Sequence, residues 1–258
     1  MGDSIISSSV GPALWLTIDR EAARNAIDPQ VMRELIDELL LAKANPSVAC
    51  VVLTGAGSKA FCAGGNLGGG MAAGAVQQHL DRALLSTLFR TMRSLGKPVI
   101  ARVNGHALGG GFGLALACDL IVSVDHAEFG TPEISIGLWP YIITSVIQRN
   151  LPEKFALEMM MLGKRIPAAK GAAMGFVNEV VPVEELDAAI ARWVEALASK
   201  SPLILRLGKD SYYAAADMDF DSALSYLESQ LTVGLQAEDA MEGIQAFIQK
   251  RAPEWKGR

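Results

Sequence analysis

Apolar residues follow two spacings along the chain, one expected of buried strands and the other of amphipathic helices. Residues 13–19 (ALWLTID) alternate between apolar and polar, and residues 49–55 (ACVVLTG) form a nearly continuous apolar run that ends in glycine. The first pattern predicts a half-buried strand and the second a strand buried on both faces. Between them, Asp28 as N-cap and Pro29 at the first position predict a helix. Its apolar face consists of Val31, Leu35 and Leu39.

Strand and helix patterns continue to alternate until about residue 182. They predict a glycine-rich turn and loop over 60–74, a helix over 76–95, strands over 98–105 and 120–125, helices around 142–150, 153–162 and 167–174, and a short strand in VNEVV. From Val183 the pattern is helical to the end, with a break at Ser201 and Pro202. This mixture predicts an α/β fold. We expect residues 1–195 to carry the site and residues 196–258 to form a separate helical region.

The composition and net charge of the chain limit the kinds of molecule that it is expected to bind. The 258 residues are 50% hydrophobic, and 23 Lys and Arg against 28 Asp and Glu give a net charge of −5 without a run of like charges. This balance argues against a nucleic acid or a membrane surface as the main partner. The apolar runs are too short to span a bilayer, and the N-terminus lacks the pattern of a secretory signal. Cys50, Cys62 and Cys118 lie in apolar runs without CxxC pairs, which predicts reduced core thiols, no metal site and a cytoplasmic location.

Three consecutive glycines, Gly109 to Gly111, stand where a strand is expected to give way to a helix. The first amides of a helix lack partners, and without Cβ atoms the backbone can approach a ligand closely. Gly64 and Gly65 form a second such turn. Two amides converging on one oxygen would form an oxyanion hole, whereas tight turns or close packing would explain the same glycines without a ligand. The run matches neither GxGxxG nor the phosphate-loop or nucleophile-elbow motifs.

Glu133 is an acid in apolar surroundings, between FGTP and ISIGLWP. Burial would raise its pKa and allow it to accept and return a proton near neutral pH. The alternative is an ordinary helix start, with Thr131 as N-cap and Pro132 at the first position. Nearby, we interpret His106 as a hydrogen-bonded residue at a strand end, and Asp119 as an anchor for the start of the next strand.

Taken together, five segments resemble the crotonase, or enoyl-CoA hydratase/isomerase, superfamily. They follow the family's order over nearly the whole chain: RNAID (24–28), KAFCAGGNL (59–67), NGHALGGGFGLALACDLIV (104–122), AEFGTPEISIGLWP (127–140) and AFIQKRAPEWKGR (246–258). The resemblance implies an α/β spiral of ββα turns, followed by a C-terminal helical region that builds a homotrimer or a hexamer of paired trimers. It also implies an acyl-CoA or enoyl-CoA thioester as substrate, and no cofactor apart from the CoA of that substrate.

The resemblance assigns roles to residues of this chain. The amides of Gly65 and Gly110 would hold the thioester oxygen, and Glu133 would be the acid and base. The adenine end of CoA would lie against Arg24, Ala26, Ile27 and Ala63, with Phe247 and Lys250 reaching CoA from a neighbouring subunit. The remaining substrate contacts that it implies are Asn66, Leu67, Gly113 and Trp139.

One departure from the family pattern bears on the reaction. Hydratases of this family with two glutamates carry an acid in the helix after the glycines, and Gly113 occupies that position here. Shifting a double bond from 3-enoyl to 2-enoyl needs one proton carrier, whereas water addition proceeds most easily with two. The sequence therefore slightly favours isomerisation over hydration through Glu133 alone. A CoA-binding protein without catalysis remains the third interpretation.

Overall fold

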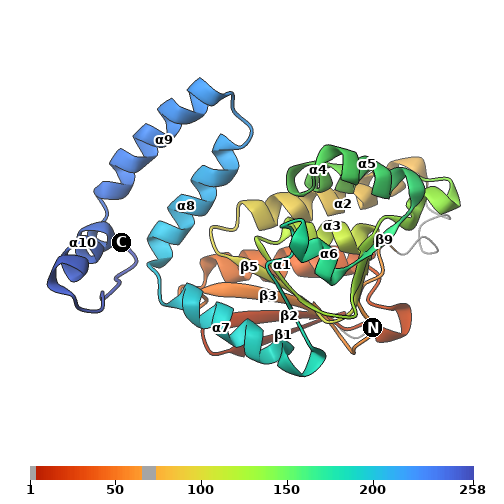
Figure 1. Cartoon of the computed structure of the whole chain (residues 1–258), viewed down its shortest axis with the longest axis horizontal. Helices are drawn as coiled ribbons and strands as arrows, with labels where there is room; N and C mark the ends of the chain where they lie inside the picture. Colours follow the sequence, from red (N-terminus) through yellow and green to blue (C-terminus); the bar gives the residue numbers. More distant parts are fainter. Residues whose placement is uncertain (1–3, 66–73) are drawn as a thin grey trace.

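The computed structural model describes residues 4–65 and 74–258. A six-stranded sheet runs through the body of the molecule (Figure 1), in the order β1-β2-β3-β5-β7-β10. Its strands are β1 (Ile5–Val10), β2 (Ala13–Ile18), β3 (Cys50–Gly55), β5 (Val99–Val103), β7 (Leu120–Val124) and β10 (Glu179–Val181). All neighbours are parallel except β1 and β2, which form an antiparallel hairpin. The sequence patterns identified every strand of this sheet except β1.

A second sheet of four short strands lies beside the first and was not predicted as strands. It contains β4 (Ala60–Cys62), β6 (His106–Leu108), β8 (Glu128–Gly130) and β9 (Arg165–Pro167), in the order β4-β6-β8-β9. Each strand has three residues, too few for alternation to be recognised. Strands β3, β5 and β7 of the large sheet each continue into β4, β6 and β8 of the small one, and a helix follows. The chain thus repeats a strand-strand-helix turn, as the family resemblance implied.

The helices of the body cover the sheets (Figure 1). They are α1 (Pro29–Ala44), α2 (Ala75–Arg93), α3 (Gly110–Ala117), α4 (Tyr141–Asn150), α5 (Glu153–Leu162), α6 (Ala168–Ala173) and α7 (Leu186–Ala198), with short 3-10 turns η1 (Glu21–Ala23), η2 (Pro132–Ile136) and η3 (Val183–Glu185). Helix α1 begins as predicted, because the Asp28 carboxylate accepts hydrogen bonds from the amides of Gln30 and Val31. No described helix is both long and apolar enough to cross a bilayer.

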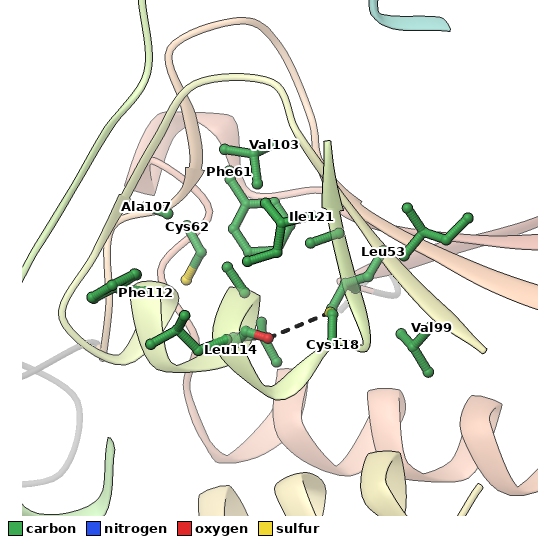
Figure 2. Close-up of a cluster of buried hydrophobic side chains, with 14 of the residues drawn as sticks. Leu53, Phe61, Cys62, Val99, Val103, Ala107, Phe112, Leu114, Cys118 and Ile121 are labelled. Carbon is green, nitrogen blue, oxygen red and sulfur yellow. Dashed lines mark hydrogen bonds between the residues drawn. The ribbon is translucent and has the colours of Figure 1, made fainter. Parts of the chain in front are cut away.

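Helix α3 is buried between the sheets and α4, and its side chains fill the centre of the core. Phe112 packs against Phe129 of β8 and Phe176, with ring centroids 5.6 Å away in both pairs. Such pairs contribute about 1 kcal/mol each beyond the area that they bury. Around the same helix, Figure 2 shows Phe61, Cys62 and Cys118 in this apolar cluster. All three cysteines are buried free thiols, as predicted. The packing fixes the N-terminus of α3 relative to β4.

Three further helices project from the body (Figure 1): α8 (Pro202–Ala215), α9 (Phe220–Leu235) and α10 (Glu238–Gln249). Helix α8 begins at the predicted break, and the Ser201 hydroxyl caps it by accepting from the amide of Ile204. Lys209 of α8 reaches back to the body and donates to Asp119 over 2.7 Å. Asp119 also accepts from the amide of Val99, so its carboxylate anchors the start of β5 and not that of the next strand, β7, as the sequence suggested. Residue 195 falls inside α7, and the division of the chain near it stays a prediction.

Candidate active site

Side chains are excluded for different steric reasons at the glycines that begin α3. Gly109 has a φ of +53°, and a Cβ there would lie 2.7 Å from Oε1 of Glu133. A Cβ on Gly111 would overlap the carbonyl oxygen of Cys62, because the first turn of α3 packs directly on the end of β4. Backbone contact and left-handed conformation both exclude ordinary side chains here. Close packing, the interpretation that needs no ligand, therefore explains Gly111. At Gly109, the left-handed backbone and the closeness of Glu133 both exclude a side chain.

The amides of Gly65 and Gly110 lie close together at the surface of this junction. A Cβ on Gly110 would be 3.4 Å from the amide nitrogen of Gly65, and one on Gly64 would be 3.3 Å from the nitrogen of Gly110. Gly110 is the first residue of α3, where an amide has no partner within the helix. Within residues 4–65 and 74–258, neither amide donates a hydrogen bond. The arrangement can place two N–H donors on one oxygen, with the positive end of the helix dipole behind them.

Glu133 brings a carboxyl group to the same place from the 3-10 turn η2. Its Oε2 is buried and has no hydrogen-bond partner among the described residues. Burial raises the pKa of Glu133 above its usual value, and a backbone hydrogen bond partly offsets that rise. A buried polar atom without a partner is costly and requires an explanation. A carboxyl group poised to exchange a proton with a bound substrate provides one.

The alternative interpretation of Glu133, as part of an ordinary capped helix start, is only partly correct. Pro132 does open a helical turn, but the turn is a 3-10 helix and Thr131 does not cap it. The buried hydroxyl of Thr131 instead donates to the carbonyl oxygen of Met159 over 3.4 Å. Thr131 therefore ties η2 to α5, and this contact helps to hold Glu133 beside the glycines.

Gly113, where a second acid would stand, is buried against two apolar side chains. A Cβ on Gly113 would overlap Cγ2 of Ile143, lie 2.7 Å from its Cβ, and lie 3.3 Å from Cζ of Phe89. Helix α4 therefore packs so closely on α3 that no side chain fits between them. The carboxyl group of Glu133 therefore lies near the amides of Gly65 and Gly110, whereas the next turn of α3, at Gly113, is covered by apolar side chains.

The segment expected to hold the adenine end of CoA runs alongside Gly64 and Gly65. The amide of Ile27 donates to the carbonyl oxygen of Gly64 over 2.9 Å, and Ile27 forms a parallel bridge with Gly65. The amide of Ala63 donates to the carbonyl oxygen of Arg24 over 3.0 Å. Ala26, half-buried, lies between these two contacts in the sequence. The structure thus brings Arg24, Ala26, Ile27 and Ala63 together with the amide pair.

Two buried asparagines that the sequence reasoning missed hold this region in place. Asn25 has a φ of +56°, is 1% exposed, and donates to the carbonyl oxygens of Ala56 and Ala60. Asn104 is 3% exposed and donates to the carbonyl oxygens of Gly55 and Gly57. Both side chains satisfy backbone groups in the turn between β3 and β4. For Asn104, its place directly after the apolar run of β5 was the signal that could have revealed it, whereas Asn25 lies among charged residues and carried no such signal.

Other residues named from the sequence lie elsewhere. Phe247 and Lys250 belong to the end of α10, where the Phe247 side chain is 85% exposed, and Figure 1 places that helix far from α3. Trp139 is half-buried and follows η2. Asn66 and Leu67 lie outside the described residues. Among the described residues, no group of three His, Cys, Asp or Glu side chains could hold a metal ion.

Comparison with known proteins identifies the family. The chain matches the family described as enoyl-CoA hydratase/isomerase over residues 11–258. It is 34% identical over 266 residues to a carnitinyl-CoA dehydratase of Proteus mirabilis and 35% identical over 263 residues to one of Salmonella typhi, with 100% of each chain covered. The crystal structure of an enoyl-CoA hydratase from Bacillus anthracis superimposes with a TM-score of 0.93 at 30% identity, covering 99% of this chain and 100% of the other. One from Polaromonas sp. JS666 gives 0.93 at 33% identity, with 98% and 99% covered.

The chain therefore belongs to the enoyl-CoA hydratase/isomerase, or crotonase, superfamily, whose enzymes act on acyl-CoA thioesters. Both the family resemblance and the α/β crotonase fold expected from the sequence are confirmed.

Proposed function

We propose that the protein catalyses proton transfer at the carbon next to the thioester carbonyl of an acyl-CoA, with Glu133 as the proton carrier. The observation that carries this proposal is the buried, unpartnered Oε2 of Glu133, whose carboxyl lies against the glycine turn that also presents the amide of Gly110. A thioester oxygen bound by the amides of Gly65 and Gly110 would be stabilised as it gains charge. Removing one such donor costs about 3 kcal/mol of transition-state stabilisation in known enzymes.

The reaction best supported is the shift of a double bond from 3-enoyl-CoA to 2-enoyl-CoA. The Glu133 carboxylate removes a proton from C2, and the electron pair spreads over C2, C3 and C4 and onto the thioester oxygen. The two glycine amides stabilise this dienolate. The same carboxyl then returns the proton to C4, which leaves the double bond between C2 and C3. No second acid takes part, in agreement with the apolar contact of Gly113 with Ile143.

Water addition to 2-enoyl-CoA, or the reverse dehydration, is the second candidate. The names of the relatives favour it, since they include carnitinyl-CoA dehydratase and enoyl-CoA hydratase. One carboxyl group could serve if it removes the C2 proton of a 3-hydroxyacyl-CoA and then delivers that proton to the departing hydroxyl group. This route requires the reacting C2 hydrogen and the hydroxyl group to lie on the same face of the substrate.

A paired assay separates these candidates. The purified protein is supplied with a 3-enoyl-CoA, a 2-enoyl-CoA and a 3-hydroxyacyl-CoA of equal chain length. We expect the 3-enoyl substrate to react fastest, and Glu133→Gln to lower that rate by about three orders of magnitude while thioester binding survives. Rapid water addition to the 2-enoyl substrate with a slow isomerisation would establish the second candidate. Full activity of Glu133→Gln on every substrate would remove Glu133 from the mechanism.

A protein that binds CoA without catalysis is the remaining interpretation, and a different measurement tests it. A saturated acyl-CoA in heavy water exchanges its C2 protons if Glu133 removes them, even when no product accumulates. We expect deuterium to enter the wild-type incubation and not that of Glu133→Gln. Tight acyl-CoA binding without any exchange would instead support the non-catalytic interpretation.

We also propose a homotrimer, alone or paired into a hexamer, as the active assembly. Helices α9 and α10 expose many apolar side chains: Phe220, Leu224, Leu231, Val233, Leu235, Met241, Ile244, Phe247 and Ile248. A monomer rarely exposes so much contiguous apolar surface, so a second copy of the chain is the expected cover. In such an assembly Phe247 and Lys250 would reach the CoA of a neighbouring subunit, residues 196–258 would form the contact region, and the location would be cytoplasmic. Sedimentation equilibrium measures the mass directly.

A further inference from the structure

Strand β1 forms an open edge of the large sheet. It stands last in the strand order and pairs with β2. All of its residues after Ile5 are exposed. Within residues 4–65 and 74–258, no backbone hydrogen bond joins residues 5–10 to a segment other than β2. The outer side of β1 therefore presents backbone donors and acceptors that the described part of the chain does not use.

The other described sheet edges are far shorter than β1. Strands β4, β9 and β10 have three residues each, and β9 ends in Pro167. Strand β1 has six residues, contains neither a charged residue nor a proline, and pairs with β2 without a bulge. Proteins normally protect an exposed edge with short strands, charges, prolines or bulges. An edge that lacks all of these is suited to pairing with another strand.

The pairing of β1 with β2 determines which backbone groups face outward. Ile5 pairs with Ile18, and one residue earlier the amide of Asp19 donates to the carbonyl oxygen of Ser4 over 2.8 Å. Hydrogen-bonded and non-hydrogen-bonded pairs alternate along an antiparallel ladder. The even-numbered residues of β1 therefore bond to β2, whereas Ser7 and Ser9 direct their amides and carbonyls away from it.

The sequence of β1 is self-complementary about Ser8. In an antiparallel pairing centred there, Ser7 of one copy lies opposite Ser9 of the other, so the outward backbone groups of the two strands meet. The same register places Ile6 opposite Val10. These two side chains are 50% and 56% exposed, and non-hydrogen-bonded pairs bring side chains closest together. Centring the pairing on Ser7 would instead place Ile6 opposite Ser8. The apolar residues thus select the register centred on Ser8.

Helix α1 holds β1 in place for such a contact. The hydroxyl of Ser7 donates to Oε2 of Glu38 over 2.8 Å, and the amide of Ser4 donates to Oε2 of Glu34 over 2.9 Å. Both acids belong to α1. Because the strand is tied to the body at two points as well as to β2, it loses little conformational freedom when a second strand pairs with it.

We propose that β1 pairs antiparallel with β1 of a second copy of this chain, in the register centred on Ser8. Both copies use the same strand, so the contact is isologous and joins their six-stranded sheets edge to edge. It goes beyond the proposed function and does not depend on it. The trimer contact proposed above uses α9 and α10, which project from the body that contains β1 (Figure 1). Either contact can therefore fail without the other.

An engineered disulfide tests the register. In the proposed contact the two copies of Ser8 face each other with Cα atoms about 4.5 Å apart, within the range that a disulfide spans. All three native cysteines are buried, so a new cysteine on β1 is the one exposed to an oxidant. We expect Ser8→Cys to form a covalent dimer in diamide, detected by electrophoresis without reductant.

Ser9→Cys is the matched control, because Ser9 is equally exposed on the same strand. In the proposed register the two copies of Ser9 are diagonal neighbours about 7–8 Å apart, too far for a disulfide without backbone movement. We expect at least about tenfold less covalent dimer than from Ser8→Cys. Equal linking by both variants would mean random encounters, and no linking by Ser8→Cys would mean that the edge is open to a strand of another protein. Either result overturns the proposal.

Sedimentation equilibrium shows whether the contact exists without a disulfide. Ser8→Lys places two ammonium groups opposite each other at the centre of the contact, and like charges there oppose pairing. We expect wild type to contain an even number of chains and Ser8→Lys to have half that mass. Ser145→Lys, an exposed serine on α4, adds the same charge elsewhere and should keep the wild-type mass.

The masses also separate this proposal from that of the trimer. A hexamer that Ser8→Lys converts to a trimer supports both contacts. A dimer that it converts to a monomer supports the β1 contact and removes the trimer. An equal mass for wild type and Ser8→Lys overturns the β1 contact, whatever the number of chains.

Discussion

The side chain of Ile143 occupies the space that a side chain on Gly113 would need. Ile143 is 3% exposed on α4, and a Cβ on Gly113 would overlap its Cγ2. The two residues belong to helices that pack directly on each other, α3 and α4. The position where a second acid would stand is therefore closed by a helix contact, and an acid can be placed there only together with a change at Ile143.

This contact predicts how the site responds to a new carboxyl group. Gly113→Glu alone should destabilise the protein by about 1–3 kcal/mol or more, because the core is overpacked, and should add no hydratase activity. Ile143→Gly removes both the Cγ2 and the Cβ that a Cβ on Gly113 would meet. We therefore expect Gly113→Glu combined with Ile143→Gly to add water to 2-enoyl-CoA faster than Ile143→Gly alone. Urea denaturation and the hydration assay measure the two effects. A stable, hydrating Gly113→Glu single variant would contradict the steric argument.

Glu133 should make stability depend on pH in a defined direction. Burial raises the pKa of Glu133 in the folded protein above its value in the unfolded chain. The folded state then binds the proton more tightly, so stability falls as pH rises from the unfolded pKa through the folded pKa. We expect Glu133→Gln to melt above wild type at pH 8, and the difference to vanish below the unfolded pKa of about 4.3.

Scanning calorimetry across this pH range tests the prediction, and Glu158→Gln is the control. Glu158 is an exposed acid whose pKa is lowered, chiefly by a hydrogen bond from Lys164, so its replacement should not raise the melting temperature at high pH. A Glu133→Gln variant less stable than wild type at pH 8 would mean that the carboxylate has a stabilising partner.

The glycines of the turn should differ in their tolerance of alanine. Gly111→Ala places a Cβ against the carbonyl oxygen of Cys62, and both groups are held by backbone. We expect a loss of about 1–3 kcal/mol or more in the free energy of unfolding. Among the described residues, a Cβ on Gly65 meets no atom within 4 Å, so Gly65→Ala should change stability by less than about 0.5 kcal/mol. Chemical denaturation of both variants measures this contrast, and a stable Gly111→Ala would show that α3 can move away from β4.

Lys209 should contribute strongly to the attachment of α8 to the body, next to Tyr213, whose hydroxyl also donates to Asp119. The Lys209 side chain is 9% exposed and its Nζ donates to Asp119 and to the carbonyl oxygens of Met92 and Lys97. Lys209→Met leaves Asp119 without its cation and should cost about 3–5 kcal/mol. Lys256→Met removes an exposed lysine 3.9 Å from Glu238 and should cost less than about 1 kcal/mol. Equal unfolding free energies for the two variants would mean that the Asp119 contact contributes little.

Local sequence patterns were sufficient to predict the helices and strands that are long or that have a clear start or end. The apolar runs of β3, β5 and β7 and the Asp28-Pro29 start of α1 are recognisable in the sequence because burial and capping depend on neighbouring residues. The break at Ser201 could also be predicted, because Ser201 caps the helix that follows it. The small sheet was missed because its strands are short and are defined by partners distant in the sequence, such as Ala60 with His106 and Ala107 with Phe129.

For the candidate site, the sequence by itself named the chemistry: two glycine turns and one acid in apolar surroundings. It did not determine that Glu133 reaches Gly109, that Ile143 fills the space beside Gly113, or that Asn25 and Asn104 hold the turn between β3 and β4. Distances between segments follow from how helices and sheets pack, and a one-dimensional pattern records only which residues are available for that packing.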